Sequence, residues 1–228
     1  RETGYDDLKE VGKVPSGTVP LMCTNWEDVL LAVKACQQKT LVIDSLSGLQ
    51  EYLIKFVTRT VYGGNYTAFK SFYNGLRQDC PVQMMELIDL FEFKRAQGTH
   101  IVLIAHRKTE AEPNSDGPDI MMQTLFGDIG ITGPVMKWAQ AILFMSGKKN
   151  VDIVTESAGR GDNVKILEGK STGTPTRLMY TSFSGAHAAK NKLELPPVII
   201  MGKSPLEGYT NFVNALPEMV KKNMVDTK

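Results

Sequence analysis

Asp44 and Ser45 stand at the end of a short apolar run, TLVI, that begins at Thr40. Such a run is typical of a buried strand, and ligands of open α/β sheets bind beyond the carboxyl ends of the strands. A carboxylate at this place can hold a magnesium ion through its water shell. The competing interpretation is that Asp44 caps the helix that follows. We predict that Asp44 holds the metal and that Asp44 and Ser45 form the ligand-binding end of the strand.

His106 ends a second apolar run, which begins at Ile101. A neutral imidazole at the end of a strand can donate a hydrogen bond to a phosphate oxygen. A histidine at this place can equally have a purely structural role, so both interpretations stay open.

Two GKS tripeptides raise the question of a phosphate-binding loop. The pattern GxxxxGK[ST] needs a glycine five positions before the glycine of its GKS or GKT. GKS occurs at residues 169–171 and 202–204, but Val164 and Pro197 stand at the required positions. We interpret both tripeptides as a turn glycine beside a solvated lysine.

Composition narrows the class of protein. The 228 residues are 42% hydrophobic, enough for one sizeable α/β domain and hardly for two full cores. Lysine and arginine number 26 and the acids 25, so no overall charge attracts the chain to nucleic acid or anionic lipid. The three cysteines lack metal-site spacing and are expected to be reduced core thiols. No apolar run approaches a membrane span of roughly 18–20 residues, so we expect a cytoplasmic protein without a membrane partner.

Helical patterns alternate with apolar runs in the first half. One helix follows a capping box formed by Thr24 and Glu27, a second follows the first strand, and a third ends at Gly98. This order predicts an α/β fold in which adjacent, parallel, buried strands at residues 41–44 and 101–106 have helices on both faces.

The second half has a different character. Residues 107–134 are rich in proline and glycine with little periodicity, which predicts a long loop that is either functional or disordered. Three further strands follow, with connections so short that antiparallel pairing at one edge is favoured. They lie at residues 141–145, 164–167 and 177–180. Ser204 and Glu207 form a capping box before a final helix.

The order of these pieces resembles the phage-associated ATP-binding proteins, which are RecA-like P-loop ATPases related to the phage single-strand annealing recombinases. The stretches that carry the resemblance are TLVIDSLSGL, YGGNYTAFKSFYNGL, GTHIVLIAHRK, WAQAILF and SGAHAAKNKLELP. The resemblance implies one RecA-like ATPase domain over residues 1–216 and a C-terminal tail at residues 217–228. The implied fold is a three-layer sheet, with parallel core strands and antiparallel strands at one edge.

The resemblance also implies roles for particular residues. Glu2 matches the position that orients and deprotonates the attacking water, and His106 matches the residue that senses the γ-phosphate. Lys190 and Lys192 match a KNR element that enters a neighbouring subunit's site, where cations neutralise the transferring phosphoryl group. Lysine replaces the usual arginine at position 192 and lacks the planar fork for bidentate contact. Gln140 stands where relatives often have aspartate.

The implied cofactors are ATP and Mg²⁺, and the implied assembly is a homo-oligomeric ring or filament in the cytoplasm, that of the bacterial host if the protein is phage-encoded. In the family the phosphate loop precedes the acidic run whose tail matches Glu2, so we expect it upstream of Arg1, unless this variant has dispensed with it.

Single-stranded DNA is a possible partner, since RecA-like recombinases bind it through loops placed as residues 107–134 are. These residues carry more acids than bases, the wrong sign for binding phosphates, so binding would need an oligomer, a divalent metal or a basic surface elsewhere. Two functions remain. One is an ATPase of phage DNA recombination, annealing or replication, and the other is a non-catalytic RecA-like protein for assembly or partner binding.

Overall fold

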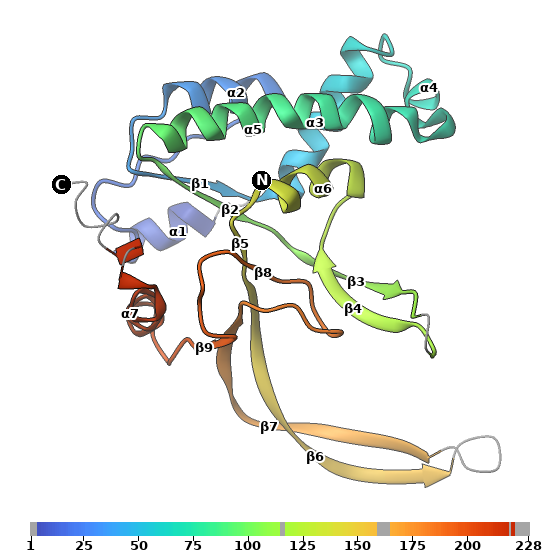
Figure 1. Cartoon of the computed structure of the whole chain (residues 1–228), viewed down its shortest axis with the longest axis vertical. Coiled ribbons are helices and arrows are strands. Elements are labelled where there is room, and N and C mark those ends of the chain that lie inside the picture. Colours follow the sequence, from blue (N-terminus) through green and yellow to red (C-terminus); the bar gives the residue numbers. More distant parts are fainter. Residues whose placement is uncertain (1–3, 115–116, 159–164, 219, 222–228) are drawn as a thin grey trace. The chain divides into compact units, whose positions relative to one another are not determined.

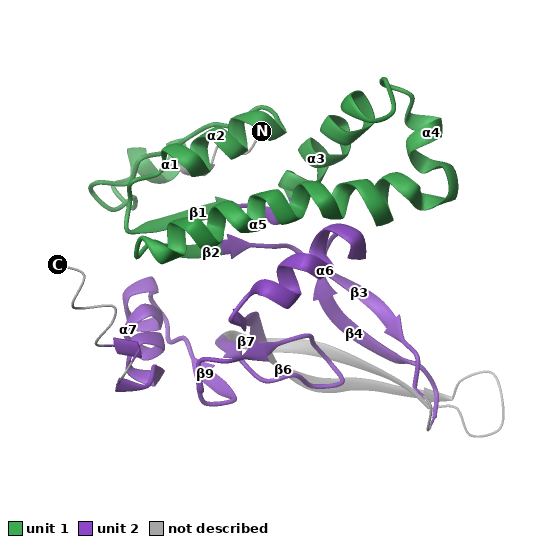
Figure 2. Cartoon of the chain, turned by 45° about the horizontal axis from the view of Figure 1, so that its top comes forward, with its two compact units in different colours: residues 1–43, 48–102 green, residues 44–47, 103–228 purple. Residues whose placement is uncertain are grey.

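The structure, a computed structural model, describes residues 4–114, 117–158, 165–218 and 220–221. It shows a mixed α/β protein (Figure 1). The chain divides into two compact units, Arg1–Ile43 with Gly48–Val102 and Asp44–Ser47 with Leu103–Lys228 (Figure 2). The division crosses two strands, and the single domain expected over residues 1–216 stays a prediction.

Helices form most of the first unit, with two short strands between them. The elements are α1 (Gly4–Glu10), α2 (Trp26–Ala35), β1 (Thr40–Asp44), α3 (Leu46–Thr60), α4 (Tyr66–Lys70), a 3₁₀ turn η1 (Ser71–Tyr73), a π-helical turn η2 (Gly75–Asp79), α5 (Cys80–Ala96) and β2 (His100–Ile104). Gly98 follows α5 with a φ of 89°, a left-handed conformation that glycine adopts without strain. The helix end predicted there is confirmed.

β1 and β2 are hydrogen-bonded neighbours in a two-stranded sheet. At their starts, the His100 amide donates to the Lys39 carbonyl oxygen (2.8 Å). Just beyond their ends, the His106 amide donates to Ser47 Oγ (3.1 Å). The starts of the two strands therefore lie beside each other, as do their ends, so the strands run parallel. The predicted adjacency is confirmed, and the helical segment between the strands is the crossover that parallel pairing requires.

One face of this sheet is exposed. Successive side chains of a strand point to opposite faces, and Val42, Val102 and Ile104 are 51%, 44% and 43% exposed. The expectation that helices cover both faces is therefore wrong for the described residues. Within the same residues the sheet has only these two strands, so the three-layer core implied by the resemblance is not shown.

The core of the first unit is built from three helices whose apolar residues recur every three or four positions. Its largest buried side chains come from α2 (Trp26), α3 (Leu53 and Val57) and α5 (Met84 and Phe91). Burying one such side chain contributes about 1.5–3 kcal/mol, whereas a two-stranded sheet alone is marginally stable. Packing between helices therefore stabilises this unit.

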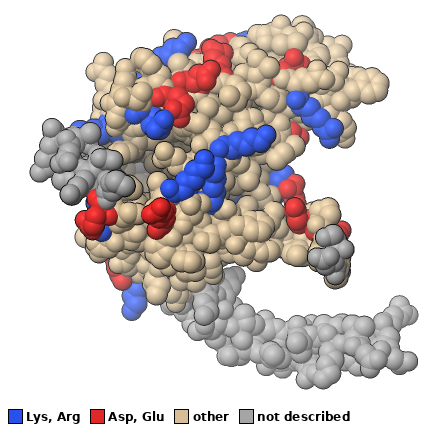
Figure 3. Space-filling view, in the orientation of Figure 1, with Lys and Arg blue, Asp and Glu red and all other residues tan. Residues whose placement is uncertain are grey.

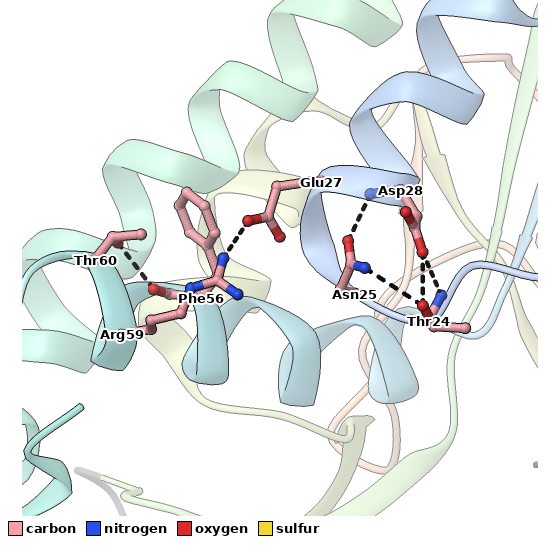
Figure 4. Close-up of polar contacts among 7 residues, drawn as sticks. All are labelled: Thr24, Asn25, Glu27, Asp28, Phe56, Arg59 and Thr60. Carbon is pink, nitrogen blue, oxygen red and sulfur yellow. Dashed lines mark hydrogen bonds and ion pairs between the residues drawn. The ribbon is translucent and has the colours of Figure 1, made fainter. Parts of the chain in front are cut away.

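The start of α2 differs from the predicted capping box. Asn25 is the N-cap, and its Oδ1 accepts from the Asp28 amide (2.8 Å). Asp28 Oδ2 in turn accepts from the amide (2.9 Å) and the hydroxyl (2.7 Å) of Thr24 (Figure 4), and these bonds lower the pKa of Asp28. Glu27, predicted to close the box, pairs with Arg59 of α3. The predicted register is wrong by one residue because asparagine is at least as good an N-cap as threonine.

The second unit contains most of the β structure. Its elements are β3 (Arg107–Glu112), β4 (Ile120–Leu125), α6 (Ile129–Trp138), β5 (Ala141–Ile142), β6 (Phe144–Ala158), β7 (Lys165–Tyr180), β8 (Lys190–Asn191), β9 (Val198–Ile200) and α7 (Pro205–Ala215). Residues 107–134, predicted to be a loop, form the antiparallel β3–β4 hairpin and the first part of α6. The prediction is wrong because both faces of this hairpin lack the apolar alternation that identifies a strand in a sequence.

Antiparallel pairing in the second unit is confirmed. β6 pairs with β7, β7 with β9, and β5 with β8. The three predicted strands are wrong in their bounds, because the described part of the run at residues 164–167 and the run at residues 177–180 both fall in the single strand β7, and the run at residues 141–145 is divided between β5 and β6. β6 and β7 form a sheet of their own with β9, so the expected attachment to the edge of the parallel strands is not shown among the described residues.

An apolar cluster packs the end of α7 against β7 and β9. Its buried members are Met179, Leu195, Ile199 and Leu216. α7 begins at the predicted capping box, where Ser204 Oγ accepts from the Glu207 amide (3.1 Å) and Glu207 Oε2 accepts from the Lys203 amide (2.7 Å). The predicted final helix is confirmed.

Gly75→Ala tests the packing at the start of η2. A Cβ at Gly75 would lie 2.2 Å from Phe69 Cδ2, in a ring that is 1% exposed. We expect the variant to lose about 1–3 kcal/mol of unfolding free energy, since overpacking forces a buried ring to move. Gly133→Ala in α6 is the control, because its Cβ would approach nothing closer than 3.7 Å. Urea unfolding measures both, and an unchanged midpoint for Gly75→Ala would contradict the packing.

Candidate functional site

Asp44 and His106 lie at the carboxyl ends of β1 and β2, and the second unit contains both ends. The hydrogen bond from the His106 amide to Ser47 Oγ holds these ends side by side. The side chains of Asp44 and His106 are exposed, Ser45 is half-buried and Ser47 is buried. The structure therefore brings the predicted residues Asp44, Ser45 and His106 to one edge of the sheet.

This edge offers a carboxylate, a hydroxyl and an imidazole to a ligand. Among the described residues, no three His, Cys, Asp or Glu side chains gather into a group that could hold a metal ion. Magnesium does not need such a group, because it is usually bound by one or two carboxylates together with water and phosphate oxygens. The arrangement therefore fits a magnesium ion that arrives with a phosphate ligand, and Asp44 is the residue that would hold it.

The start of α6 lies next to His106. The Phe126 amide donates to the His106 carbonyl oxygen (2.7 Å), and α6 begins three residues later. Asp128 is its N-cap and accepts from the Gly130 amide (2.8 Å). The Asp128 carboxylate thereby complements the partial positive charge of the helix N-terminus beside this edge.

Lys190 and Lys192 have different surroundings. Lys190 Nζ donates to the carbonyl oxygens of Met136 (2.9 Å) and Lys137 (2.7 Å) in the last turn of α6. Desolvation, followed by the charge of Lys192, lowers the pKa of Lys190. Lys192 is exposed, and its amide donates to the Gln140 carbonyl oxygen (3.0 Å). Lys190 thus caps α6 in this structure, and the role of either lysine in a neighbouring subunit stays a prediction.

The remaining predicted positions are Glu2 and the two GKS stretches. Glu2 lies outside the described residues. Gly202 has a φ of 63° in the turn before α7, as expected for a turn glycine. Gly169 lies inside β7, paired with Ile153, so the interpretation of the first GKS as a turn is wrong.

No family model, curated protein or solved structure matches this chain. The resemblance to RecA-like ATPases therefore rests on the stretches quoted above, and the nucleotide, metal, DNA and oligomer remain predictions. Among the helices that the structure describes, none is long and apolar enough to cross a membrane.

The first unit carries a second candidate surface that the sequence analysis did not assign. Three aromatic residues, Tyr66, Phe72 and Tyr73, are 50%, 89% and 59% exposed, beside the cations of Lys70 and Arg77. We call these five residues the aromatic–basic surface. The Lys70 ammonium lies 4.7 Å from the Tyr66 ring centroid, and the Arg77 guanidinium carbon lies 5.0 Å from that of Tyr73. Clustered exposed apolar side chains of this size usually mark a binding surface.

The backbone under this surface has an uncommon conformation. Phe72 and Tyr73 have φ values of 51° and 59°, in the left-handed region that costs a side-chain-bearing residue roughly 1–3 kcal/mol. Beneath them, the buried ring of Phe69 packs against Tyr62 and Tyr66 with ring centroids 5.7 Å apart in both pairs. Residues held in this left-handed conformation cluster at functional positions.

The local charge of this segment is positive. Residues 62–79 contain two cations, Lys70 and Arg77, and one acid, Asp79. The Tyr62 hydroxyl donates to Asp79 Oδ2 (2.5 Å), a bond that raises the pKa of Tyr62 to about 12. Figure 3 shows mostly uncharged residues over α4, whereas basic and acidic residues are interspersed elsewhere on the same face. An anionic partner with flat rings suits this surface.

A sequence signal for this surface existed. The stretch YTAFKSFYNGLR alternates aromatic and basic residues, the composition that binds single-stranded nucleic acid. Residues 107–134, where RecA-like recombinases would bind DNA, have the wrong charge sign for that role. There the structure has the β3–β4 hairpin, in which Lys108 Nζ pairs with Glu110 Oε1 (2.5 Å).

Lys190→Met tests the cap on α6. Loss of two hydrogen bonds from a cation should lower the free energy of unfolding by about 1–3 kcal/mol, because the last carbonyl groups of the helix lose their donor. Lys192→Met is the matched control and should stay within about 0.5 kcal/mol of the wild type, since its side chain is exposed. Urea unfolding of both variants measures the difference. Equal losses would contradict the capping role.

Proposed function

We propose that this protein is a RecA-like, magnesium-dependent ATPase that assembles as an oligomer and acts on single-stranded DNA in phage DNA metabolism. The observation that carries the proposal is the edge where β1 and β2 end. Asp44 and His106 extend from neighbouring parallel strands, and the Ser47–His106 hydrogen bond holds the two ends together. Ligands of parallel sheets bind at such an edge.

Each residue has a role within the proposal. When bound, magnesium would neutralise charge on the phosphates of ATP. Asp44 would hold the ion, His106 would donate a hydrogen bond to the terminal phosphate, and the exposed ammonium of Lys192 would serve a neighbouring subunit. The proposal requires a phosphate-binding loop that neither GKS stretch provides, because Val164 and Pro197 stand where the first glycine of the pattern is needed.

The exposed face of the β1–β2 sheet supports the finer fold that we propose. Val42, Val102 and Ile104 present apolar side chains to solvent from neighbouring strands. Parallel strands are usually covered on both faces. In the proposed RecA-like, three-layer arrangement, further elements would cover this face.

The aromatic–basic surface supports single-stranded DNA as the partner. Unpaired bases stack on aromatic rings, and their phosphates are attracted by neighbouring cations. Tyr66, Phe72 and Tyr73 offer the rings, and Lys70 and Arg77 the charges. This surface is positively charged, as phosphate binding requires, whereas the β3–β4 hairpin is not.

Asp44→Asn tests the metal site. In the natural gene product, we expect the variant to lose ATP hydrolysis by at least about 100-fold, because the amide keeps the volume of the side chain but removes the charge that holds magnesium. Phosphate release at saturating Mg²⁺ and ATP measures the rate.

Asp89→Asn is the matched control, since Asp89 is an exposed carboxylate on α5 and has no role in the proposal. It should leave turnover unchanged. Unchanged turnover in Asp44→Asn would reduce Asp44 to a helix cap. A wild-type protein that neither binds nor hydrolyses ATP would favour the second function, a non-catalytic assembly or partner-binding protein.

Phe72→Ala tests the DNA surface. Loss of one stacked base should weaken binding of an oligothymidylate by about 5- to 100-fold, since each base–aromatic stack contributes roughly 1–3 kcal/mol. Arg77→Met should weaken it less and should reduce its salt dependence, because Arg77 offers charge to the phosphates. Fluorescence anisotropy at two salt concentrations measures both effects.

Tyr209→Ala is the control for an exposed ring. Tyr209 lies on α7 and is 62% exposed, similar to Tyr73, but it is not part of the aromatic–basic surface. Its variant should bind DNA as the wild type does. If Phe72→Ala and Tyr209→Ala weaken DNA binding equally, or if neither variant weakens it, DNA does not bind at this surface.

A further inference from the structure

A cavity of about 520 Å³ lies in the first unit, where α2 and α5 end. Its walls are residues 34–37, at the end of α2 and just beyond it, and Phe93, Lys94, Gln97 and Thr99 around the end of α5. This volume falls within the range of about 300–1,000 Å³ that is usual for small-molecule sites. The cavity lies on different elements from Asp44 and His106 and from the aromatic–basic surface.

Lys94 is a buried cation in the wall of this cavity. The residue is 6% exposed, and its Nζ donates to the Cys36 carbonyl oxygen (2.6 Å). Cys36 and Lys94 both line the cavity. An ammonium has three N–H donors, and among the described residues this carbonyl is the acceptor that it contacts.

The positive charge makes the burial of Lys94 energetically costly unless a further partner binds the ammonium. A buried ammonium is destabilising unless it is paired and hydrogen-bonded, and one carbonyl oxygen satisfies it only in part. No carboxylate of the described residues lines the cavity, whereas a second cation, Lys34, does. The side-chain amides of Gln37 and Gln97 add N–H donors at the opening. The lining therefore favours an anion.

Capping alone does not account for the burial of Lys94. A lysine can bind the last carbonyl oxygens of a helix from a less buried position, as Lys190 does at the end of α6. Lys94, in contrast, is almost completely buried although it makes only one hydrogen bond of this kind within the part of the chain that the structure describes.

We propose that this cavity binds a small organic anion. The phosphoryl or carboxylate oxygens of the ligand accept hydrogen bonds from Lys94 and Lys34, and its apolar part packs on Phe93, a ring that is 59% exposed at the wall. The proposal is independent of ATP hydrolysis, because it needs neither Asp44 nor a phosphate loop.

The probes are phenyl phosphate, benzoate and inorganic phosphate, added to the ¹⁵N-labelled protein and followed by NMR. We expect the amides of residues 34–37 and 93–99 to shift and saturate. Tighter binding of phenyl phosphate than of benzoate identifies a phosphoryl site, and the reverse order a carboxylate site. Benzylammonium, which has the same ring with a positive charge, should not shift these amides.

Lys94→Met should raise the Kd for phenyl phosphate about tenfold or more, since hydrogen bonds between charged groups are the strong ones. Lys34→Met should raise it less. Phe93→Ala should weaken phenyl phosphate and leave inorganic phosphate unchanged. Lys55→Met, an exposed lysine of α3 outside this cavity, is the matched control and should bind as the wild type does.

If Lys94→Met does not fold, Lys34→Met and Phe93→Ala decide the question, because both side chains are exposed. The proposal is overturned if these variants bind the probes as the wild type does, or if benzylammonium shifts the same amides. Asp44→Asn should leave the binding unchanged. A loss of binding in that variant would assign the anion to the strand ends and would likewise overturn the proposal for this cavity.

Discussion

Parallel pairing of β1 with β2 determines where the candidate chemistry of this protein lies. Parallel neighbours need a crossover connection, which leaves both carboxyl ends at the same edge of the sheet. The hydrogen bond from the His106 amide to Ser47 Oγ joins residues 59 positions apart in sequence and fixes that edge. Asp44 thereby becomes a neighbour of the second strand end, as the order of helices and apolar runs predicts.

The crossover itself forms the other two candidate sites. α3, α4, η1, η2 and α5 bury an apolar core, and this core holds a strained turn from which Phe72 extends into solvent. The same helix α5 supplies Lys94 to the cavity beside the end of α2. One segment thus provides sheet geometry, an aromatic–basic surface and a buried cation. The three sites are chemically separate, so each can be lost without the others.

Sequence periodicity was sufficient for elements whose apolar residues repeat. The helices around Leu53 and Phe91 and the strands that lead to Asp44 and His106 were predicted because burial imposes spacing. Periodicity was insufficient for features of the structure that depend on polar contacts. Asn25 displaced Thr24 as the N-cap, since both residue types suit that position. Nothing in the local sequence shows that Lys94 is buried, because its burial results from the packing of two helix ends that are far apart in the chain.

The central claim is that the shared edge of β1 and β2 binds a metal–nucleotide ligand, and paramagnetic NMR tests it most directly. Mn²⁺ with ADP, added to the ¹⁵N-labelled gene product, broadens amide signals close to the ion, whether or not hydrolysis follows. The account predicts that the amides of Ser45, Ser47 and His106 broaden first, and that Asp44→Asn removes the effect. Broadening that spares these three amides, or that persists unchanged in Asp44→Asn, would contradict it.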